Sequence, residues 1–200
     1  MKNSVTTDQN GVVFLRGFKT ILRPPNRVLD HDLFYRWIND PDIWCFLKRF
    51  APISHQSEGE WIDKMNTQNN SQIFTIETHE GQPIGVMGLE KIDWKNRHAM
   101  TGSFIGEKCF WGQGYGTDAK MALLKYAFDE LNLHKVMSGV ISFNKRSLAY
   151  SKKCGYVEQG CLKDHVFRDG KYHDETLLAV FRSSWHVAYS AYLNKMNSKK

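Results

Sequence analysis

Three glycines alternate with two other residues in WGQGYGTDA, residues 111–119, directly before a long helical pattern. Gly112, Gly114 and Gly116 permit a tight turn in which several backbone N–H groups point the same way, at the positive end of the following helix dipole. Such a nest binds phosphate oxygens. A glycine-rich connection between a strand and a helix explains the same spacing, so the glycines alone leave both interpretations open.

Two common phosphate motifs fit this stretch poorly. A Walker loop needs Lys and then Ser or Thr after its last glycine, whereas Gly116 is followed by Thr117 and Asp118. A dinucleotide fingerprint needs its third glycine where Thr117 stands, and an acidic residue about 20 residues further on, where the next strand offers none at its end. We therefore disfavour both motifs.

The glycine run lies among alternating strand and helix patterns. Strand patterns cover VVFLRGFKTILRP, IFTIET, PIGVMGLEKIDW, HAMTGSFIG and KVMSGVIS. A long hairpin follows, which we expect to turn at Asp169 and Gly170. Helix patterns cover DLFYRWIND, SEGEWIDKM, residues 115–131, KRSLAYSKKC and a last amphipathic segment. Meandering strands with interspersed helices predict an α+β fold with a mixed sheet.

The first two helices carry candidate caps. Asp30 or Asp32 is placed to cap the first helix. Ser57, followed three residues later by Glu60, matches a capping box for the second helix.

Composition indicates one domain. The 200 residues are 42% hydrophobic and 24% charged, enough to bury a core, and the four cysteines form no C-x-x-C pair. No charged-then-apolar leader and no apolar stretch near roughly 20 residues is present, so we expect a cytoplasmic protein without a membrane partner. The folded domain is expected over residues 12–194, with flexible tails at 1–11 and 195–200.

The formal net charge of +6 is dispersed along the chain. It indicates a modest preference for anionic ligands, and we expect no nucleic-acid partner. Nucleic-acid binding stays a hypothesis to test, and it predicts salt-sensitive binding to DNA or RNA.

Further motifs make the sequence resemble the GCN5-related N-acetyltransferase (GNAT) superfamily, in its branch of ribosomal-protein N-terminal and spermidine acetyltransferases. The segments RWINDPDI, IGVMGLEKIDWKNRHA, FIGEKCFWGQGYGTDA, NKRSLAYSKKCGYVEQG and VFRDGKYHDETLLAVF occur in the family's order. The resemblance covers about Phe14 to Trp185. It implies a mostly antiparallel sheet with one splayed strand pair, flanked by helices, and acetyl-CoA as cosubstrate with no metal. Trp111 departs from the family's Gln or Arg, which matters little for a role carried by backbone N–H groups.

The resemblance also implies where acetyl-CoA binds. Its pantetheine arm would pair with the backbone from Ser103 to Ile105, and its pyrophosphate would lie on the glycine run. Lys152 or Lys153 would approach the 3′-phosphate, or else lie on a solvated helix face. The expected cofactor contacts are Phe104, Ile105, Gly112, Gln113, Gly114, Tyr115, Gly116, Thr117, Asn144 and Ser147.

By the same resemblance, Tyr150 is the catalytic residue that protonates the leaving sulfur. Ser147 is an alternative donor, or a residue that only supports the start of the helix. The attacking amine must also lose a proton, because an alkyl ammonium has a pKa near 10.

The resemblance is weakest for the general base that takes the proton of the attacking amine. Met100 stands where family members often carry glutamate, and a thioether accepts no such proton. Glu90, Asp93 and His98 are the remaining candidates, and we expect Glu90 to be the base. Strand alternation predicts that Glu90 shares a face with Ile92, and Asp93 is expected to cap the following turn.

The acceptor is expected to be a primary amine, either a peptide N-terminus or a small molecule. Aromatic groups with few acids suit these better than a polyamine. The resemblance implies that the first two helices and the late hairpin shape the acceptor pocket, where they supply Trp37, Asn39, Asp40, Trp44, Phe46, Trp61, His165, Arg168, His173 and Asp174. His165, His173 and Asp174 lack a ligand set with suitable spacing, so no metal is expected there.

Two points stay open at this level. A CoA-binding sensor or scaffold without catalysis is the alternative function, motivated by Met100. A homodimer is open as well, because family members often pair through edge strands.

Overall fold

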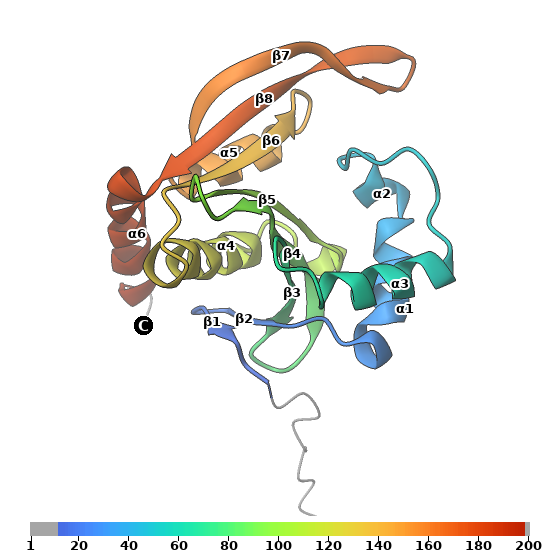
Figure 1. The fold of residues 1–200 in the computed structure, drawn as a ribbon, viewed down its shortest axis with the longest axis horizontal. Coiled ribbons are helices and arrows are strands. Elements are labelled where there is room, and N and C mark those ends of the chain that lie inside the picture. Colours follow the sequence, from blue (N-terminus) through green and yellow to red (C-terminus); the bar gives the residue numbers. More distant parts are fainter. Residues whose placement is uncertain (1–11, 199–200) are drawn as a thin grey trace, which may run out of the picture.

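The computed structural model describes residues 12–198, which form one eight-stranded sheet in the order β1-β2-β3-β4-β5-β6-β8-β7, flanked by helices (Figure 1). The strands are β1 (Leu15–Arg16), β2 (Thr20–Arg23), β3 (Gln72–Thr78), β4 (Pro83–Asp93), β5 (His98–Ile105), β6 (Lys135–Ile141), β7 (Val157–Arg168) and β8 (Lys171–Phe181). Neighbouring strands are antiparallel except β5 and β6, which are parallel. The expected mixed, mostly antiparallel sheet is confirmed.

Six α-helices lie within the described residues. They are α1 (Arg27–Ile38), α2 (Pro41–Trp44), α3 (His55–Met65), α4 (Tyr115–Lys125), α5 (Lys145–Lys153) and α6 (Arg182–Asn197). A 3-10 turn, η1 (Lys108–Phe110), precedes the glycine run, and a π-helical turn, η2 (Tyr126–Glu130), continues α4. No helix among residues 12–198 is long and apolar enough to cross a bilayer.

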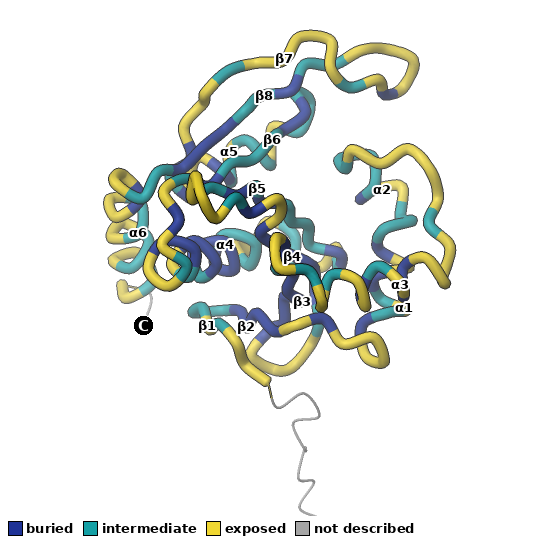
Figure 2. Tube along the Cα trace, viewed as in Figure 1, coloured by how far each residue is buried: buried dark blue, intermediate teal, exposed yellow. Residues whose placement is uncertain are grey.

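Two apolar clusters cover the two faces of the sheet. The larger cluster joins α4 and Trp185 of α6 to residues of β3 to β6 and β8. The smaller one joins Phe34 and Trp37 of α1 and Ile62 of α3 to Val86 of β4. Burial is deepest in α4 and the central strands, whereas β7 is largely exposed (Figure 2).

Both predicted turns are present. The side chain of Asp93 accepts a hydrogen bond from the Asn96 backbone N–H at 2.7 Å. The β7–β8 hairpin turns at Asp169 and Gly170, whose φ angles of 51° and 76° are those of a two-residue turn that matches the strand twist.

The predicted helix caps are wrong. Asn26 caps α1, because the buried Asp30 carboxylate binds the Arg23 guanidinium through two hydrogen bonds of 2.7 Å. Ser54 rather than Ser57 caps α3. In both cases the cap precedes the apolar pattern by more residues than the sequence suggested.

The last helix also continues beyond the predicted domain end. Helix α6 runs to Asn197, so the first three residues of the predicted tail at 195–200 are helical. The predicted tail at 1–11 lies outside the described residues.

Candidate active site

The glycine run forms an open nest at the start of α4. Gly112 and Gly114 have φ angles of 75° and 87°, in the left-handed region that side chains disfavour. No heavy atom lies within 4 Å of a Cβ built on either residue. Gly114 precedes α4 without a side-chain cap. The first N–H groups of the helix, at residues 115–117, are thus available to an anion.

A lysine that the sequence did not single out lies beside this nest. Lys19, from the turn between β1 and β2, donates from Nζ to the Gln113 carbonyl at 3.0 Å, and its ammonium is 5.1 Å from the Tyr115 ring centroid. Its positive charge adds to the field that attracts an anion. Lys152 and Lys153 lie exposed in the last turn of α5. No local pattern could select Lys19, which is 94 residues from Gln113.

The sheet splits beside the nest. Strands β5 and β6 pair only as far as Met100 and Met137, although they continue to Ile105 and Ile141. A Cβ built on Gly116 would lie 3.9 Å from both the Ile105 side chain and the Tyr150 ring. The nest, the separated end of β5 and helix α5 therefore meet at one place, as the family resemblance implied.

One backbone group at this edge is already bonded. The Trp111 indole N–H donates to the Ile105 carbonyl at 2.7 Å. The Phe104 side chain turns to the opposite face of the sheet, where its ring lies edge-on to Trp37 with centroids 6.5 Å apart. Ser103 and Phe104, the other two residues predicted to pair with the pantetheine arm, lie on the separated part of β5. Neither has a pairing partner on β6.

Tyr150 lies against the separated part of β5. Its hydroxyl is 3.1 Å from Ser103 Oγ. Burial raises the pKa of Tyr150 well above its ordinary value. Such a phenol stays protonated at neutral pH and can give its proton to a leaving thiolate.

A buried lysine lies beside Tyr150, and no sequence pattern pointed to it. Lys120 on α4 is 3% exposed, and its ammonium is 5.8 Å and 5.9 Å from the ring centroids of Tyr150 and Tyr156. Burial lowers the pKa of Lys120 to about 8, and burial raises the pKa of the adjacent Cys154 thiol to about 12. At neutral pH the cation would favour the phenolate that Tyr150 forms on giving up its proton.

Asn144 and Ser147 build the start of α5. The Asn144 side chain caps the helix by accepting a hydrogen bond from the Ser147 backbone N–H at 3.0 Å. This hydrogen bond stabilises the start of the helix that carries Tyr150. It agrees with the alternative in which Ser147 only supports the start of the helix. Contact of either residue with the cofactor stays a prediction.

The structure places Glu90 beside Met100. The two residues are direct partners across β4 and β5. The Glu90 carboxylate reaches along β5, because its Oε1 lies 3.1 Å from a Cβ built on Gly102. An exposed carboxylate thus lies next to the position where the family often has glutamate, at the start of the split.

The predicted alternation around Glu90 is wrong. Strand β4 carries a bulge between Glu90 and Asp93, with Lys91 at a φ of 51°. Ile92 therefore joins Leu89 in the larger buried cluster, while Glu90 is exposed.

The β7–β8 hairpin carries three side chains with a buried polar atom that has no hydrogen-bond partner. These atoms are Arg168 Nε, His173 Nε2 and Glu175 Oε2, and the last of them lies 3.6 Å from Nε2 of the exposed His165. Arg168 pairs with Lys171, which places it on the same hairpin face as His173 and Glu175. We refer to Arg168, His173 and Glu175 as the hairpin cluster. Buried polar groups in folded proteins are nearly always satisfied, so these three atoms are candidates for contact with a ligand.

Glu175 lies at the split itself. It is 1% exposed, and its Oε1 would lie 1.7 Å from a Cβ on Gly139 of β6, so a side chain at position 139 would displace the Glu175 carboxylate. Gly139 is two residues beyond Met137, the last residue of β6 that pairs with β5. The sequence could not select Glu175, because its position depends on strand register.

Lys48 contacts the hairpin cluster, and Arg146 stacks on two aromatic rings. Lys48 Nζ donates to Glu175 Oε1. The Arg146 guanidinium lies 4.2 Å from the Trp111 ring centroid and 5.7 Å from that of Phe46. Lys48 therefore already supplies a positive charge to the Glu175 carboxylate.

Among the other predicted acceptor residues, Trp37 is buried, and its indole N–H donates to Glu107 at 2.9 Å. His165, His173 and Asp174 do not form a converging group of possible metal ligands. Asp174 instead pairs with Lys163 at 2.8 Å.

Comparison with known proteins adds to this geometry. Residues 19–157 match the family model described as acetyltransferase (GNAT) domain. The chain is 26% identical over 183 residues to the [ribosomal protein uS5]-alanine N-acetyltransferase of Escherichia coli (strain K12), covering 81% of this chain and 94% of that protein. It is 31% identical to YdaF of Bacillus subtilis (strain 168) over 107 residues, which are 54% of this chain and 58% of YdaF.

A solved structure is similar as well. The spermidine N-acetyltransferase of Vibrio cholerae, in complex with CoA and spermine, superposes with a TM-score of 0.78 at 25% identity, covering 84% of this chain and 98% of that one.

Proposed function

The chain belongs to the GNAT family of acetyltransferases, and we propose that it transfers the acetyl group of acetyl-CoA to the N-terminus of a peptide held by the hairpin cluster. That the chain is an acetyl-CoA-dependent acyltransferase follows from its family and its named relatives. The choice of a peptide rests on the three buried atoms that make no hydrogen bond, Arg168 Nε, His173 Nε2 and Glu175 Oε2. The last of these lies near the exposed His165 imidazole, at 3.6 Å.

The cofactor would lie along the split. The N–H groups at the start of α4 and the Lys19 ammonium suit the pyrophosphate. The backbone of β5 after Met100 has no strand partner on the β6 side, so it can pair with the extended pantetheine arm. In this arrangement the thioester lies near Ser103 and Tyr150.

The hairpin cluster matches a peptide N-terminus better than a polyamine. Glu175 Oε2 can accept a hydrogen bond from an ammonium, while Arg168 Nε can only donate and therefore needs an acceptor such as a peptide carbonyl. A polyamine offers cationic donors and no acceptor. Its several charges would also meet Lys48, which already binds Glu175.

The transfer itself needs two proton movements. The α-amino group of a peptide has an ordinary pKa near 8, so a modest base suffices, and Glu90 beside Met100 is proposed to remove its proton directly or through water. The amine then attacks the thioester carbon, and a backbone N–H of β5 near Ile105 stabilises the oxyanion. The carbon–sulfur bond breaks, and Tyr150 gives its proton to the sulfur.

The non-catalytic alternative loses its motivation in this arrangement. It rested on Met100, and the Glu90 carboxylate lies beside that residue.

The test offers acetyl-CoA together with three acceptor classes: short peptides with free N-termini, spermidine and spermine, and amino sugars. Acetylated products and released CoA are separated by chromatography and identified by mass. We expect peptides to be acetylated at the α-amino group with kcat/KM at least tenfold above that for polyamines. Preference for spermidine would contradict the assignment of the acceptor, and the absence of any product would contradict the transfer.

Two matched variants locate the acceptor. Glu175→Gln keeps the shape of the side chain but removes its charge, so we expect the KM for the peptide to rise at least tenfold with acetyl-CoA binding unchanged. Glu158→Gln is the control, because Glu158 is exposed on the same hairpin. Equal KM values for the two variants would contradict a role of Glu175 in binding the ammonium.

A further inference from the structure

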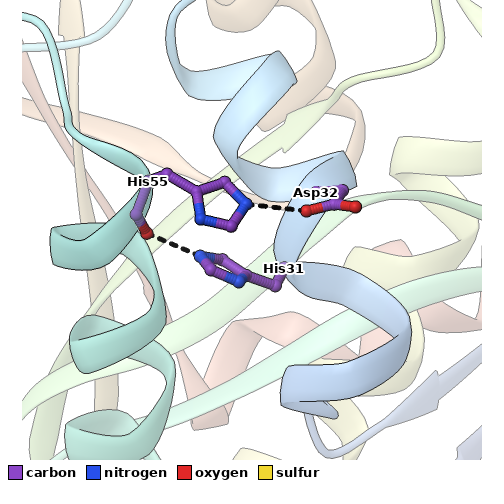
Figure 3. Close-up of side chains that lie close together, drawn as sticks. All are labelled: His31, Asp32 and His55. Atoms are coloured by element: carbon purple, nitrogen blue, oxygen red, sulfur yellow. Dashed lines mark hydrogen bonds and ion pairs between the residues drawn. The ribbon is translucent and has the colours of Figure 1, made fainter.

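Two helices bring three metal-binding side chains together away from the reaction site. His31 and Asp32 are successive residues of α1, and His55 is the first residue of α3 (Figure 3). One donor atom of each residue lies within 4.8 Å of the others. We refer to these three residues as the α1–α3 cluster. Within residues 12–198 no other three His, Cys, Asp or Glu side chains converge in this way.

The side chains are already held close to ligand geometry. His55 Nε2 donates to Asp32 Oδ1 at 2.8 Å, and His31 Nε2 donates to the His55 backbone carbonyl at 2.6 Å. The two imidazole ring centroids are 3.9 Å apart. In a tetrahedral site with bonds of 2.0–2.1 Å, ligand atoms lie about 3.3 Å from one another. Small side-chain rotations therefore suffice to place three donors around one ion.

These hydrogen bonds oppose metal binding only weakly. The side chains of His55 and Asp32 are 56% and 89% exposed. A solvent-exposed pair of this kind adds little to stability. Exposure also gives an ion direct access from solvent.

The donor set selects the kind of ion. Two imidazoles and one carboxylate suit Zn²⁺ and other borderline transition ions, whereas Mg²⁺ and Ca²⁺ prefer oxygen ligands alone. Three protein ligands would leave a fourth position to water.

A buried carboxylate on α3 lies within electrostatic reach of His31. Glu58 lies one turn after His55 on α3 and is 4% exposed. Burial raises the pKa of the Glu58 carboxyl, while the charges of Arg49 and His31 lower it. Ligating imidazoles commonly donate their other N–H to a carboxylate or a backbone carbonyl. Glu58 and the His55 carbonyl are the two candidates for that partner of His31.

We propose that His31, Asp32 and His55 bind one Zn²⁺, and that this ion joins α1 to α3. These helices supply Phe34, Trp37 and Ile62 to the smaller apolar cluster, which covers β4 and Phe104. An ion bound by both α1 and α3 would hold together the two helices that cover this part of the sheet. The proposal does not depend on the acceptor proposed above, because it concerns residues outside the reaction.

The test uses the untagged full chain, freed of metal with a chelator and then titrated with Zn²⁺ by calorimetry and thermal unfolding. We expect one equivalent to bind. At a free Zn²⁺ concentration 100-fold above the Kd, the Tm should rise by about 5 to 11 °C. Co²⁺ in place of Zn²⁺ should give the visible bands of a tetrahedral site without a thiolate-to-cobalt band, because Cys109 and Cys161 are not ligands.

Variants complete the test. His31→Ala and His55→Ala should each keep the metal-free Tm and lose most of the rise with Zn²⁺. His186→Ala should behave like the parent protein, since His186 is exposed on α6. The proposal is overturned by the absence of binding below about 100 µM Zn²⁺, by an undiminished response in His55→Ala, or by a thiolate band with Co²⁺.

Discussion

Replacing Tyr150 by Phe tests the proposed proton donor most directly. The change removes one hydroxyl and keeps the ring that lies beside Lys120 and Gly116. A general acid contributes roughly 10²- to 10⁴-fold to a rate, so kcat should fall by that factor, or about 3 to 5 kcal/mol in the barrier. Acetyl-CoA should still bind within about twofold of the parent affinity, because the glycine nest is unchanged.

The structural cost of Tyr150→Phe should be small. The hydroxyl makes one hydrogen bond, of 3.1 Å to Ser103, so its removal should lower the free energy of unfolding by about 1 kcal/mol. Tyr156→Phe is the matched control, because its hydroxyl is 3.0 Å from Thr101 Oγ1 and its ring is equally close to Lys120. Both variants should lose similar stability, but only Tyr150→Phe should lose kcat.

The assay measures acetylated product by mass against time, with the best acceptor from the panel. It is repeated over a pH series, because the raised pKa of Tyr150 predicts that the acid stays protonated, with no fall in kcat from its titration below about pH 10. An unchanged kcat in Tyr150→Phe, or an equal loss in Tyr156→Phe, would refute the reasoning.

Three further predictions test the nest, the buried lysine and the core. Gly114→Ala puts a side chain in the left-handed region, so it should lower the free energy of unfolding by about 1–2 kcal/mol and weaken acetyl-CoA binding. Gly170→Ala is equally strained at the hairpin turn, so it should cost similar stability but leave binding unchanged. Equal Kd values for acetyl-CoA in the two variants, measured by calorimetry, would contradict the nest. Lys120 has a pKa of about 8 in the fold against 10.5 when unfolded, so the unfolded chain binds more protons between these pH values and stability rises with pH across that window. Lys120→Met should remove this rise and increase the free energy of unfolding by about 3 kcal/mol at pH 7. The control is Lys125→Met at an exposed position, and equal free energies of unfolding for the two variants in denaturant would contradict the prediction. Arg23→Met leaves the buried Asp30 carboxylate without its cationic partner, so it should lower the free energy of unfolding in denaturant by about 3–5 kcal/mol. Arg27→Met, at an exposed ion pair, should lower it by less than about 1 kcal/mol. Similar losses in the two variants would refute the argument.

Local patterns in the sequence were reliable where a structure depends on neighbouring residues. The glycine run before α4, the Asp93 turn and the Asp169–Gly170 turn all follow from backbone conformations that a few adjacent residues determine. The family resemblance supplied the split of the sheet and the position of Tyr150.

Local patterns failed where a distant residue competes for the same group. Asp30 has the type and place of a helix cap, yet its carboxylate binds Arg23 in the core, and Asn26 takes the cap instead. The alternation around Glu90 fails because the bulge at Lys91 turns Ile92 into the core.

The sequence by itself thus determined the order of the elements, the glycine nest and the family, because each depends on adjacent residues or on a run of motifs. Only the tertiary structure decided which charged groups meet at the split and on the helices. Glu175 lies over Gly139 through strand register, and His55 meets His31 through the packing of α3 on α1. Such contacts join residues far apart in the chain, and no local spacing encodes the distance between them.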